Sequence, residues 1–203
     1  KSLKAYGISE ADIKSKIFKL IKENIDKKKN YNHLLRVALN KKIISISLRD
    51  RIKPKNNFCI KLVNYERVKP EYKNLKYKKI LSYLSKMNTS KEDIALCVKD
   101  RIFETGTSNL LFVKNNKIYS PKNKYYRGTN FKFYEKKFNI IKKDIYLKEL
   151  NQFDEILLIG SGKGVVSTSY ILDGKWKRKK TTVFNSMYKI FKKEFRKEKY
   201  IYN

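Results

Sequence analysis

Glycine is scarce in this chain, and most of it falls in three short segments. Only seven glycines occur, and five of them stand at positions 106, 128, 160, 162 and 164. Glycine lets backbone N–H groups approach an anion closely, and a helix N-terminus adds a favourable dipole. We therefore expect phosphate-binding backbone at Gly128, which opens a predicted helix, and in the loop from Gly160 to Gly164. Neither segment has the spacing of a P-loop or a dinucleotide-binding fingerprint, and each taken alone is also typical of a simple turn.

Histidine and cysteine narrow the possible chemistry further. His33 is the only histidine, so a Ser-His-Asp or Cys-His nucleophile would have to centre on it, and a zinc site would lack its usual imidazoles. His33 begins a strand-like segment, where a packed or half-exposed role is expected. Cys59 and Cys97 stand in apolar runs, which favours buried thiols in a reducing compartment over a disulfide or a metal pair. Catalysis would then come from lysine, carboxylate or a cofactor.

A second cluster joins a carboxylate to small polar residues. It runs Glu104-Thr105-Gly106-Thr107-Ser108-Asn109 into the apolar run 110–113, and a tight turn then leads to Ser120-Pro121. This pattern resembles the signature of the class IV aminotransferase family, in which Glu, a small polar run and Asn precede a strand, a turn and a Thr/Ser-Pro. Other landmarks of the family occur in the same order: Lys73-Asn74-Leu75 upstream, Gly128-Thr129 after the Ser-Pro, and the segment 154–158 before the glycine loop. The resemblance spans most of the chain from Leu34 onward.

The resemblance implies a pyridoxal phosphate (PLP) enzyme. Lys73 matches the family's Schiff-base lysine, which would bind the cofactor aldehyde and then move the substrate proton, and Lys76 or Lys78 is the alternative. Glu104 matches the partner of the pyridine nitrogen, whose protonation makes the ring an electron sink. The other cofactor contacts that the resemblance implies are Ser108, Asn109, Gly128, Thr129, Ser161 and Gly162.

The chain departs from the family pattern in three respects. Phe131 stands where the family usually has Arg, and Lys76 stands where the lyases of the family usually have Asn. The family's first stretch, with a phosphate-binding Arg and part of the dimer contact, has no counterpart here. Because the chain also lacks an initiator Met, we expect it to begin inside a longer protein.

Two segments favour a lyase within this family. Gly160-Ser161-Gly162-Lys163-Gly164 resembles the Asn-Ser-x-Arg-Gly loop of the aminodeoxychorismate lyases, which places Lys163 where those enzymes have an Arg facing the substrate carboxylates. Lys73-Asn74-Leu75 resembles the lyase lysine segment, whereas the Gly-Asn-Tyr of branched-chain aminotransferases is absent. The resemblance thus implies a homodimer that releases pyruvate from aminodeoxychorismate and forms p-aminobenzoate for folate synthesis. A class IV aminotransferase acting on branched-chain or D-amino acids is the alternative.

The basic charge balance raises a second alternative, a nucleic-acid-binding protein without enzymatic activity. Lys and Arg number 50 against 19 Asp and Glu, which gives a formal net charge of +31. The lysines are spread over every segment, and the densest basic run, 177–180, follows the predicted turn Asp173-Gly174. An A/T-rich codon bias accounts for this distribution better than a nucleic-acid surface does. No run reaches the roughly eighteen apolar residues of a membrane span, which favours a cytoplasmic protein.

Hydrophobic periodicity predicts a mixed α/β fold in two parts. Residues 1–49 would be the end of a small N-terminal α/β domain, 50–57 a linker, and 58–203 a larger PLP-binding domain with a pseudo-barrel sheet and flanking helices. Predicted helices cover 9–25, capped by Ser9 with Asp12 in the capping-box position, and 75–87, 129–141, 147–152 and 184–199. Predicted strands cover 34–40, 43–49, 58–65, 94–98, 110–113, 117–120, 155–159, 165–169 and 171–172, with tight turns at 41–42, 115–116 and 173–174.

Overall fold

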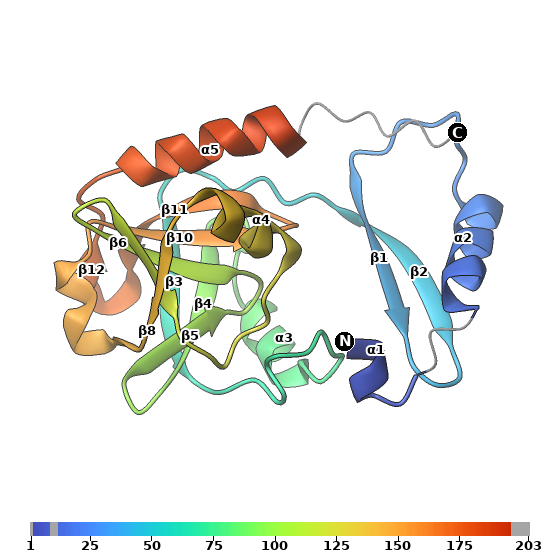
Figure 1. The fold of residues 1–203 in the computed structure, drawn as a ribbon, viewed down its shortest axis with the longest axis horizontal. Helices are drawn as coiled ribbons and strands as arrows, with labels where there is room; N and C mark the ends of the chain where they lie inside the picture. The colour runs from blue at the N-terminus through green and yellow to red at the C-terminus, as the bar shows by residue number, and fades with distance from the viewer. Residues whose placement is uncertain (1, 9–11, 196–203) are drawn as a thin grey trace. The chain divides into compact units, whose positions relative to one another are not determined.

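The computed structural model describes residues 2–8 and 12–195 and divides the chain into two compact units (Figure 1). Unit 1 comprises Lys1–Ile52 and Tyr72–Leu75, and unit 2 comprises Lys53–Glu71 and Lys76–Asn203. The chain first passes from unit 1 to unit 2 between residues 52 and 53. The assignment of residues 1–49, 50–57 and 58–203 to domains and linker remains a prediction.

Unit 1 contains a two-stranded hairpin and two helices. The elements are α1 (Ser2–Ala5), α2 (Ile13–Asn24), β1 (His33–Leu39) and β2 (Ile44–Asp50). The predicted hairpin is confirmed: the strands pair antiparallel, and the Asn40 side chain closes the turn by accepting hydrogen bonds from the N–H groups of Lys42 and Ile43, each at 2.8 Å. Strand alternation places apolar residues of both strands on one face. None of the described residues of unit 1 is buried.

Helix α2 begins later than predicted. Its N-cap is Asp12, which has a left-handed backbone (φ 61°) and makes no side-chain capping hydrogen bond. Asp12 therefore does not occupy the interior capping-box position that the sequence suggested. Ser9, the predicted cap, lies outside the described residues.

Unit 2 is built around a mixed sheet of ten strands. The strands are β3 (Phe58–Asn64), β4 (Glu92–Val98), β5 (Arg101–Thr105), β6 (Asn109–Lys114), β7 (Lys117–Pro121), β8 (Ile140–Lys143), β9 (Ile145–Tyr146), β10 (Glu155–Gly160), β11 (Gly164–Ile171) and β12 (Trp176–Lys177). Their order is β8-β7-β6-β10-β11-β3-β4-β5-β9, with β12 paired to β11. The pairs β11–β3, β3–β4 and β7–β8 are parallel, and the others are antiparallel.

Helices flank this sheet, so the predicted mixed α/β class is confirmed (Figure 1). The helical elements of unit 2 are α3 (Lys78–Leu84), α4 (Thr129–Lys137), α5 (Thr182–Phe195) and the 3-10 turns η1 (Leu147–Gln152) and η2 (Leu172–Gly174). The part of the predicted last helix beyond residue 195 lies outside the described residues. Within the ranges described, every helix is too short or too polar to span a bilayer.

The sheet of unit 2 buries apolar side chains on both faces. Along β10, Ile156 and Leu158 enter one core with side chains from β3, β4, β5, β6 and β11, which shows that the sheet curves around this core. The alternate residues Leu157 and Ile159 enter a second core beneath α4 and α5. A third core lies between α3 and the strands β3 and β4. Strands buried on both faces read as continuous apolar runs, as 156–159 and 110–113 do.

Buried polar groups in unit 2 have specific partners. The Glu155 carboxylate accepts the backbone N–H groups of Val183 at 2.8 Å and Phe184 at 2.9 Å, so it caps the first turn of α5. The indole N–H of Trp176 donates to the Phe153 carbonyl at 2.9 Å. Cys59 and Cys97 are buried free thiols, as predicted, and burial raises the pKa of both.

Strands account for the main differences between the predicted elements and the structure. Strand β5 was not predicted, because only Ile102 and Phe103 form its apolar run. The helix predicted over 129–141 ends at Lys137, and residues 140–143 instead form β8, which pairs in parallel with β7. The two strands predicted over 165–172 form the single strand β11, with a register irregularity between Thr168 and Tyr170.

Candidate active site

Glu104 is a buried carboxylate at the end of β5. Its side chain is 4% exposed, and its Oε1 accepts a hydrogen bond from Nε of Arg67 at 2.6 Å. The Arg67 guanidinium also donates through Nη2 to the backbone oxygen of Gly106 at 3.3 Å. The second carboxylate oxygen of Glu104 accepts the backbone N–H of Tyr126 at 3.2 Å. A buried negative charge is therefore neutralised by an arginine and oriented by a backbone donor.

The Asn109 side chain makes hydrogen bonds to both ends of the segment 126–128. Its amide nitrogen donates to the Tyr126 carbonyl at 2.6 Å, and its amide oxygen accepts the Gly128 N–H at 3.2 Å. A Cβ at Gly128 would stand 3.0 Å from that oxygen, so the approach leaves little room for a side chain. Glu104 of β5 and Asn109 of β6, two strands that follow one another in the chain, thus both bond to this segment.

The N-terminus of α4 follows this segment directly. Gly128 is the N-cap, and the helix begins at Thr129, as the sequence predicted. The N–H groups of a first helical turn have no partner within the helix and favour an anion. The Asn130 side chain donates to the Gly160 carbonyl at 3.3 Å, which brings the β10–β11 turn to the helix N-terminus.

The β10–β11 turn, residues 161–163, connects two paired strand ends. Gly160 pairs with Gly164 across the turn. A Cβ on Gly160 would meet the Ser108 hydroxyl at 2.7 Å, so this position requires glycine for close approach to the β5–β6 turn, residues 106–108. Gly164 has φ +75°, and a Cβ there would also meet the Phe191 ring of α5 at 2.6 Å. Ser161 and Gly162 therefore lie in a turn whose backbone path is tightly restricted.

Lys163, the remaining residue of this turn, is directed into the protein. Its ammonium lies 3.2 Å from Oδ2 of Asp93, and the two side chains are only 5% and 0% exposed. The same nitrogen lies 4.8 Å from the centre of the Phe58 ring. In this structure the lysine that the resemblance assigned to substrate carboxylates is bonded to a carboxylate of the protein itself.

Most of the predicted site residues belong to unit 2, where hydrogen bonds and close contacts connect Glu104, Ser108, Asn109 and Gly128 with the α4 N-terminus and the β10–β11 turn. Lys73 belongs to unit 1 instead. It lies in an exposed loop before α3, where its backbone N–H donates to the Ser2 hydroxyl at 2.9 Å. The alternative lysines, Lys76 and Lys78, belong to unit 2 and are exposed.

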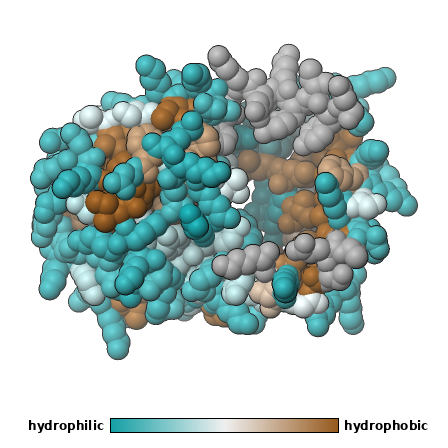
Figure 2. Space-filling model, viewed as in Figure 1, coloured by the Kyte–Doolittle hydropathy of each residue, from teal (hydrophilic) through white to brown (hydrophobic). Residues whose placement is uncertain are grey.

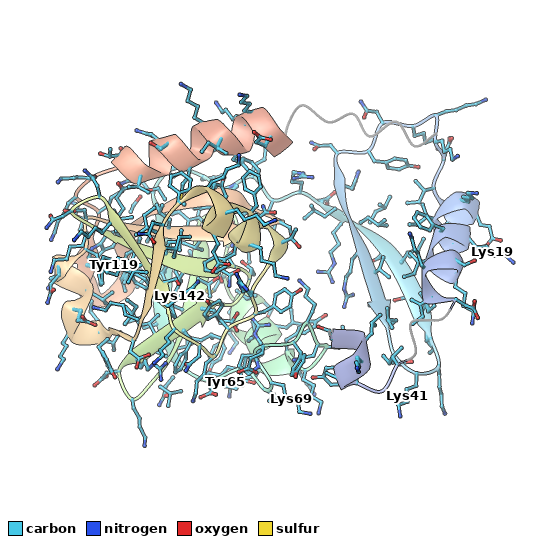
Figure 3. All side chains as sticks on the ribbon, viewed as in Figure 1. Lys19, Lys41, Tyr65, Lys69, Tyr119 and Lys142 are labelled. Carbon is cyan, nitrogen blue, oxygen red and sulfur yellow. The ribbon has the colours of Figure 1, made fainter. Side chains whose placement is uncertain are left out.

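Sequence reasoning missed Arg67, Asp93 and Asn130. Arg67 stands in an irregular segment, and only the fold shows that it reaches Glu104. Asp93 offered a usable signal, because it is a carboxylate directly before the apolar run 94–98. Phe131, which stands where the family usually has Arg, is buried, and the ammonium of Lys142 lies 4.2 Å from the centre of its ring. Lys142 is labelled in Figure 3.

Known proteins share this fold at low sequence identity. A structure from Legionella pneumophila assigned as a 4-amino-4-deoxychorismate lyase matches with a TM-score of 0.77 and 14% identity over 95% of this chain and 81% of that chain. The branched-chain amino acid aminotransferase from Escherichia coli matches with a TM-score of 0.71 and 14% identity over 96% and 75%. A PLP-bound aminotransferase from Brucella abortus matches with a TM-score of 0.59 and 15% identity over 75% and 58%.

A search of curated protein sequences finds no match. The sequence profile of class IV amino-transferases, however, matches residues 1–171, which is most of the chain. The matched range includes all the predicted site residues, from Lys73 to Lys163. The chain therefore belongs to the class IV aminotransferase family.

Proposed function

We propose that the chain is a PLP-dependent 4-amino-4-deoxychorismate lyase, which releases pyruvate and forms p-aminobenzoate. The family match and the PLP-bound relative support PLP as the cofactor. The lyase reaction is supported by the residue types of the β10–β11 turn and of Lys73-Asn74-Leu75. The fold shared with the Legionella pneumophila structure over nearly the whole chain agrees with it.

The surroundings of Glu104 fit the pyridine end of PLP. An ionised carboxylate can accept several hydrogen bonds, so Glu104 can receive a ring N–H beside the bonds from Arg67 and Tyr126. Burial strengthens such a bond, because little water competes for it. Glu104 would thus keep a proton on the ring nitrogen.

The α4 N-terminus fits the phosphate end. Thr129 and Asn130 present first-turn N–H groups, and the hydrogen bond from Asn130 to Gly160 brings the turn with Ser161 and Gly162 to the same place. Helix N-termini and glycine-rich turns are common phosphate sites because both direct backbone N–H groups at the anion. These residues would anchor and orient the cofactor.

The main support for the proposal is the way hydrogen bonds fix the segment 126–128. One end of it donates to Glu104, and the other end opens α4, with Asn109 bonded to both ends. Three residues span at most about 10 Å, so the ring-nitrogen partner and the phosphate donors are held at a short, defined separation. That arrangement suits a compact ligand with a basic nitrogen at one end and a phosphate at the other.

When bound, PLP supplies an electron sink for the substrate carbon that carries the amino group. The chain's own residues would bind and orient it: Glu104 through the ring N–H, and the α4 first turn through the phosphate. Lys73 would bind the cofactor aldehyde and move the substrate proton. Arg67 would neutralise Glu104 and hold its orientation.

Pyruvate release tests this proposal. Purified protein with PLP and aminodeoxychorismate, without any added keto acid, should release pyruvate and form p-aminobenzoate in equal amounts. Lys73→Ala should abolish both, whereas the control Lys143→Met, in an ion pair with Glu149, should leave both unchanged. If amino groups instead pass to an added keto acid and no pyruvate appears, the chain is an aminotransferase and the lyase proposal fails.

A further inference from the structure

Asp93 is a fully buried carboxylate that connects two turns of the candidate site. It stands on β4 and is 0% exposed. Its Oδ2 accepts the Thr107 hydroxyl at 2.5 Å, the Thr105 hydroxyl at 3.2 Å and the Lys163 ammonium at 3.2 Å. Its Oδ1 accepts the backbone N–H of Ile94 at 2.8 Å. One side chain therefore bonds to the β5–β6 turn and to the β10–β11 turn.

The two turns are also in direct contact. Gly160 approaches Ser108 so closely that any Cβ would collide with its hydroxyl. The backbone N–H of Ser108 donates to the Thr105 hydroxyl at 2.8 Å, and that hydroxyl bonds to Asp93. The conformation of the β5–β6 turn is therefore linked to Asp93. A shift of either turn would break bonds that converge on Asp93.

The Lys163 side chain is fixed by its contacts with Asp93 and Phe58. Its side chain is 5% exposed and lies against Asp93 and the face of Phe58. Withdrawing the ammonium to reach a substrate would leave the Asp93 charge buried with hydroxyl and backbone donors only, and an uncompensated buried charge is strongly destabilising. Geometry and electrostatics both favour an inward Lys163.

We propose that Asp93 and Lys163 are positioning residues, which form a buried clamp that holds the β10–β11 turn against the β5–β6 turn. The clamp sets where Ser161 and Gly162 stand beside the α4 N-terminus. Through the β10–β11 turn it supports the phosphate end of the candidate site. Only this assignment to the phosphate end depends on the proposed PLP function.

A double-mutant cycle in the protein without added cofactor tests the clamp itself. Asp93→Asn and Lys163→Met should each lower the urea midpoint clearly, and the double variant should lower it by much less than the sum, because each single change leaves a buried group unpaired. The matched control is the more exposed pair Lys143–Glu149, whose side chains are 37% and 19% exposed. Lys143→Met and Glu149→Gln should be close to additive. Additive losses at Asp93 and Lys163 would overturn the clamp.

If the substitutions at Asp93 and Lys163 prevent folding, a milder variant still tests the clamp. Thr107→Val removes one hydroxyl bond to Asp93 without unpairing a charge. It should raise the hydrogen-exchange rates of residues 161–163 as well as those of its own turn. Unchanged exchange at 161–163 would show that the two turns are not coupled through Asp93.

A separate measurement tests whether the clamp acts at the phosphate end of the candidate site. Affinities for PLP and for pyridoxal, which lacks the phosphate, are compared by absorbance titration of wild type and Lys163→Met. The variant should reduce the preference for PLP over pyridoxal about tenfold, with little change for pyridoxal. An unchanged preference together with a raised KM for the lyase substrate would overturn the proposal and make Lys163 a substrate ligand. If wild type binds neither compound, the proposed function fails, while the cycle above still decides the clamp.

Discussion

Strands β1 of unit 1 and β10 of unit 2 have similar lengths but very different burial. Strand β1 alternates exposed and half-buried residues, with Leu35 44% and Val37 37% exposed. Strand β10 buries five of its six residues. The apolar residues at the surface of unit 1 are visible in Figure 2. The difference lies in the neighbours: β1 pairs with one strand, whereas β10 lies between two strands with a core on each face.

This contrast shows that an apolar pattern alone does not produce a core. A two-stranded hairpin is at best marginally stable by itself, because too few elements cover its apolar face. The candidate site divides in the same way. Glu104, Asn109 and the α4 N-terminus are held by hydrogen bonds in unit 2, whereas Lys73 stands in an exposed loop of unit 1. The electrostatic part of the site is thus preorganised by a buried framework.

Amide hydrogen exchange should give the largest difference between the units. Amides of β6 and β10 should exchange only through global unfolding, and those of β1 and β2 through local opening, so their protection should differ on the order of 10³-fold or more. Exchange measured residue by residue by NMR would show it. Equal protection of β1 and β10 would contradict the contrast.

Truncating one leucine in each unit should give the next largest difference. Leu157→Ala removes a fully buried side chain at the centre of the sheet, so it should cost about 2–5 kcal/mol of the free energy of unfolding. Leu35→Ala, at a 44% exposed position, should cost less than about 1 kcal/mol. Urea unfolding followed by circular dichroism measures both. Similar losses would show that unit 1 is as well packed as unit 2.

Helix capping offers a smaller contrast. Glu155→Ala removes the carboxylate that accepts two N–H groups of α5 and should cost about 1–2 kcal/mol. Asp12→Gly, at the N-cap of α2, should have almost no effect, because Asp12 makes no capping bond and Gly tolerates its left-handed backbone. The same unfolding experiment compares the two variants. An equal loss from Asp12→Gly would mean that α2 is capped in solution.

The smallest expected effect is pH-dependent. Burial acts to raise the pKa of Glu149, but hydrogen bonds from Lys143 and from the Tyr146 N–H outweigh it and lower the pKa below its ordinary value. A lowered folded-state pKa stabilises the fold above the unfolded value, and this contribution is lost as pH falls through the folded value. Glu149→Gln should therefore be less stable than wild type at pH 7, by below about 1 kcal/mol, and equal to it in acid.

The ion pair of α2 is the control for that pH series. Lys19 and Glu23 lie 3.9 Å apart with side chains 76% and 53% exposed. Glu23→Gln should show no measurable difference at either pH. A loss that is the same at pH 7 and in acid would show that Glu149 acts through packing and not through its charge.

Local signals predicted much of the fold. The turn at Asn115-Asn116 was predictable because Asn tolerates positive φ, and both residues have it, at 49° and 59°. Strands β6 and β10 were predictable from their continuous apolar runs, because a strand that is buried on both faces carries apolar side chains at successive positions. Gly128-Thr129 was placed by the family pattern, in which it follows the Ser-Pro, and the helix does begin at Thr129.

Long-range pairing could not be predicted from local pattern. Residues 140 and 141 read as the end of a helix, yet parallel pairing with β7 makes 140–143 a strand. The short apolar run of β5 hides the strand that carries Glu104. Arg67 and Asp93 reach their partners across 37 and 70 residues of sequence, respectively, in the bonds to Glu104 and Lys163. Such contacts depend on the assembled sheet.

In the proposed function, PLP binds to Lys73, while Glu104 and the α4 N-terminus hold the two ends of the cofactor. Borohydride reduction of the protein with bound PLP, followed by peptide mapping, tests this assignment. We expect a single stable label on Lys73, lost in Lys73→Ala. A label on Lys76 or Lys78 would contradict the assignment of Lys73, and the absence of any specific label would contradict the PLP function itself.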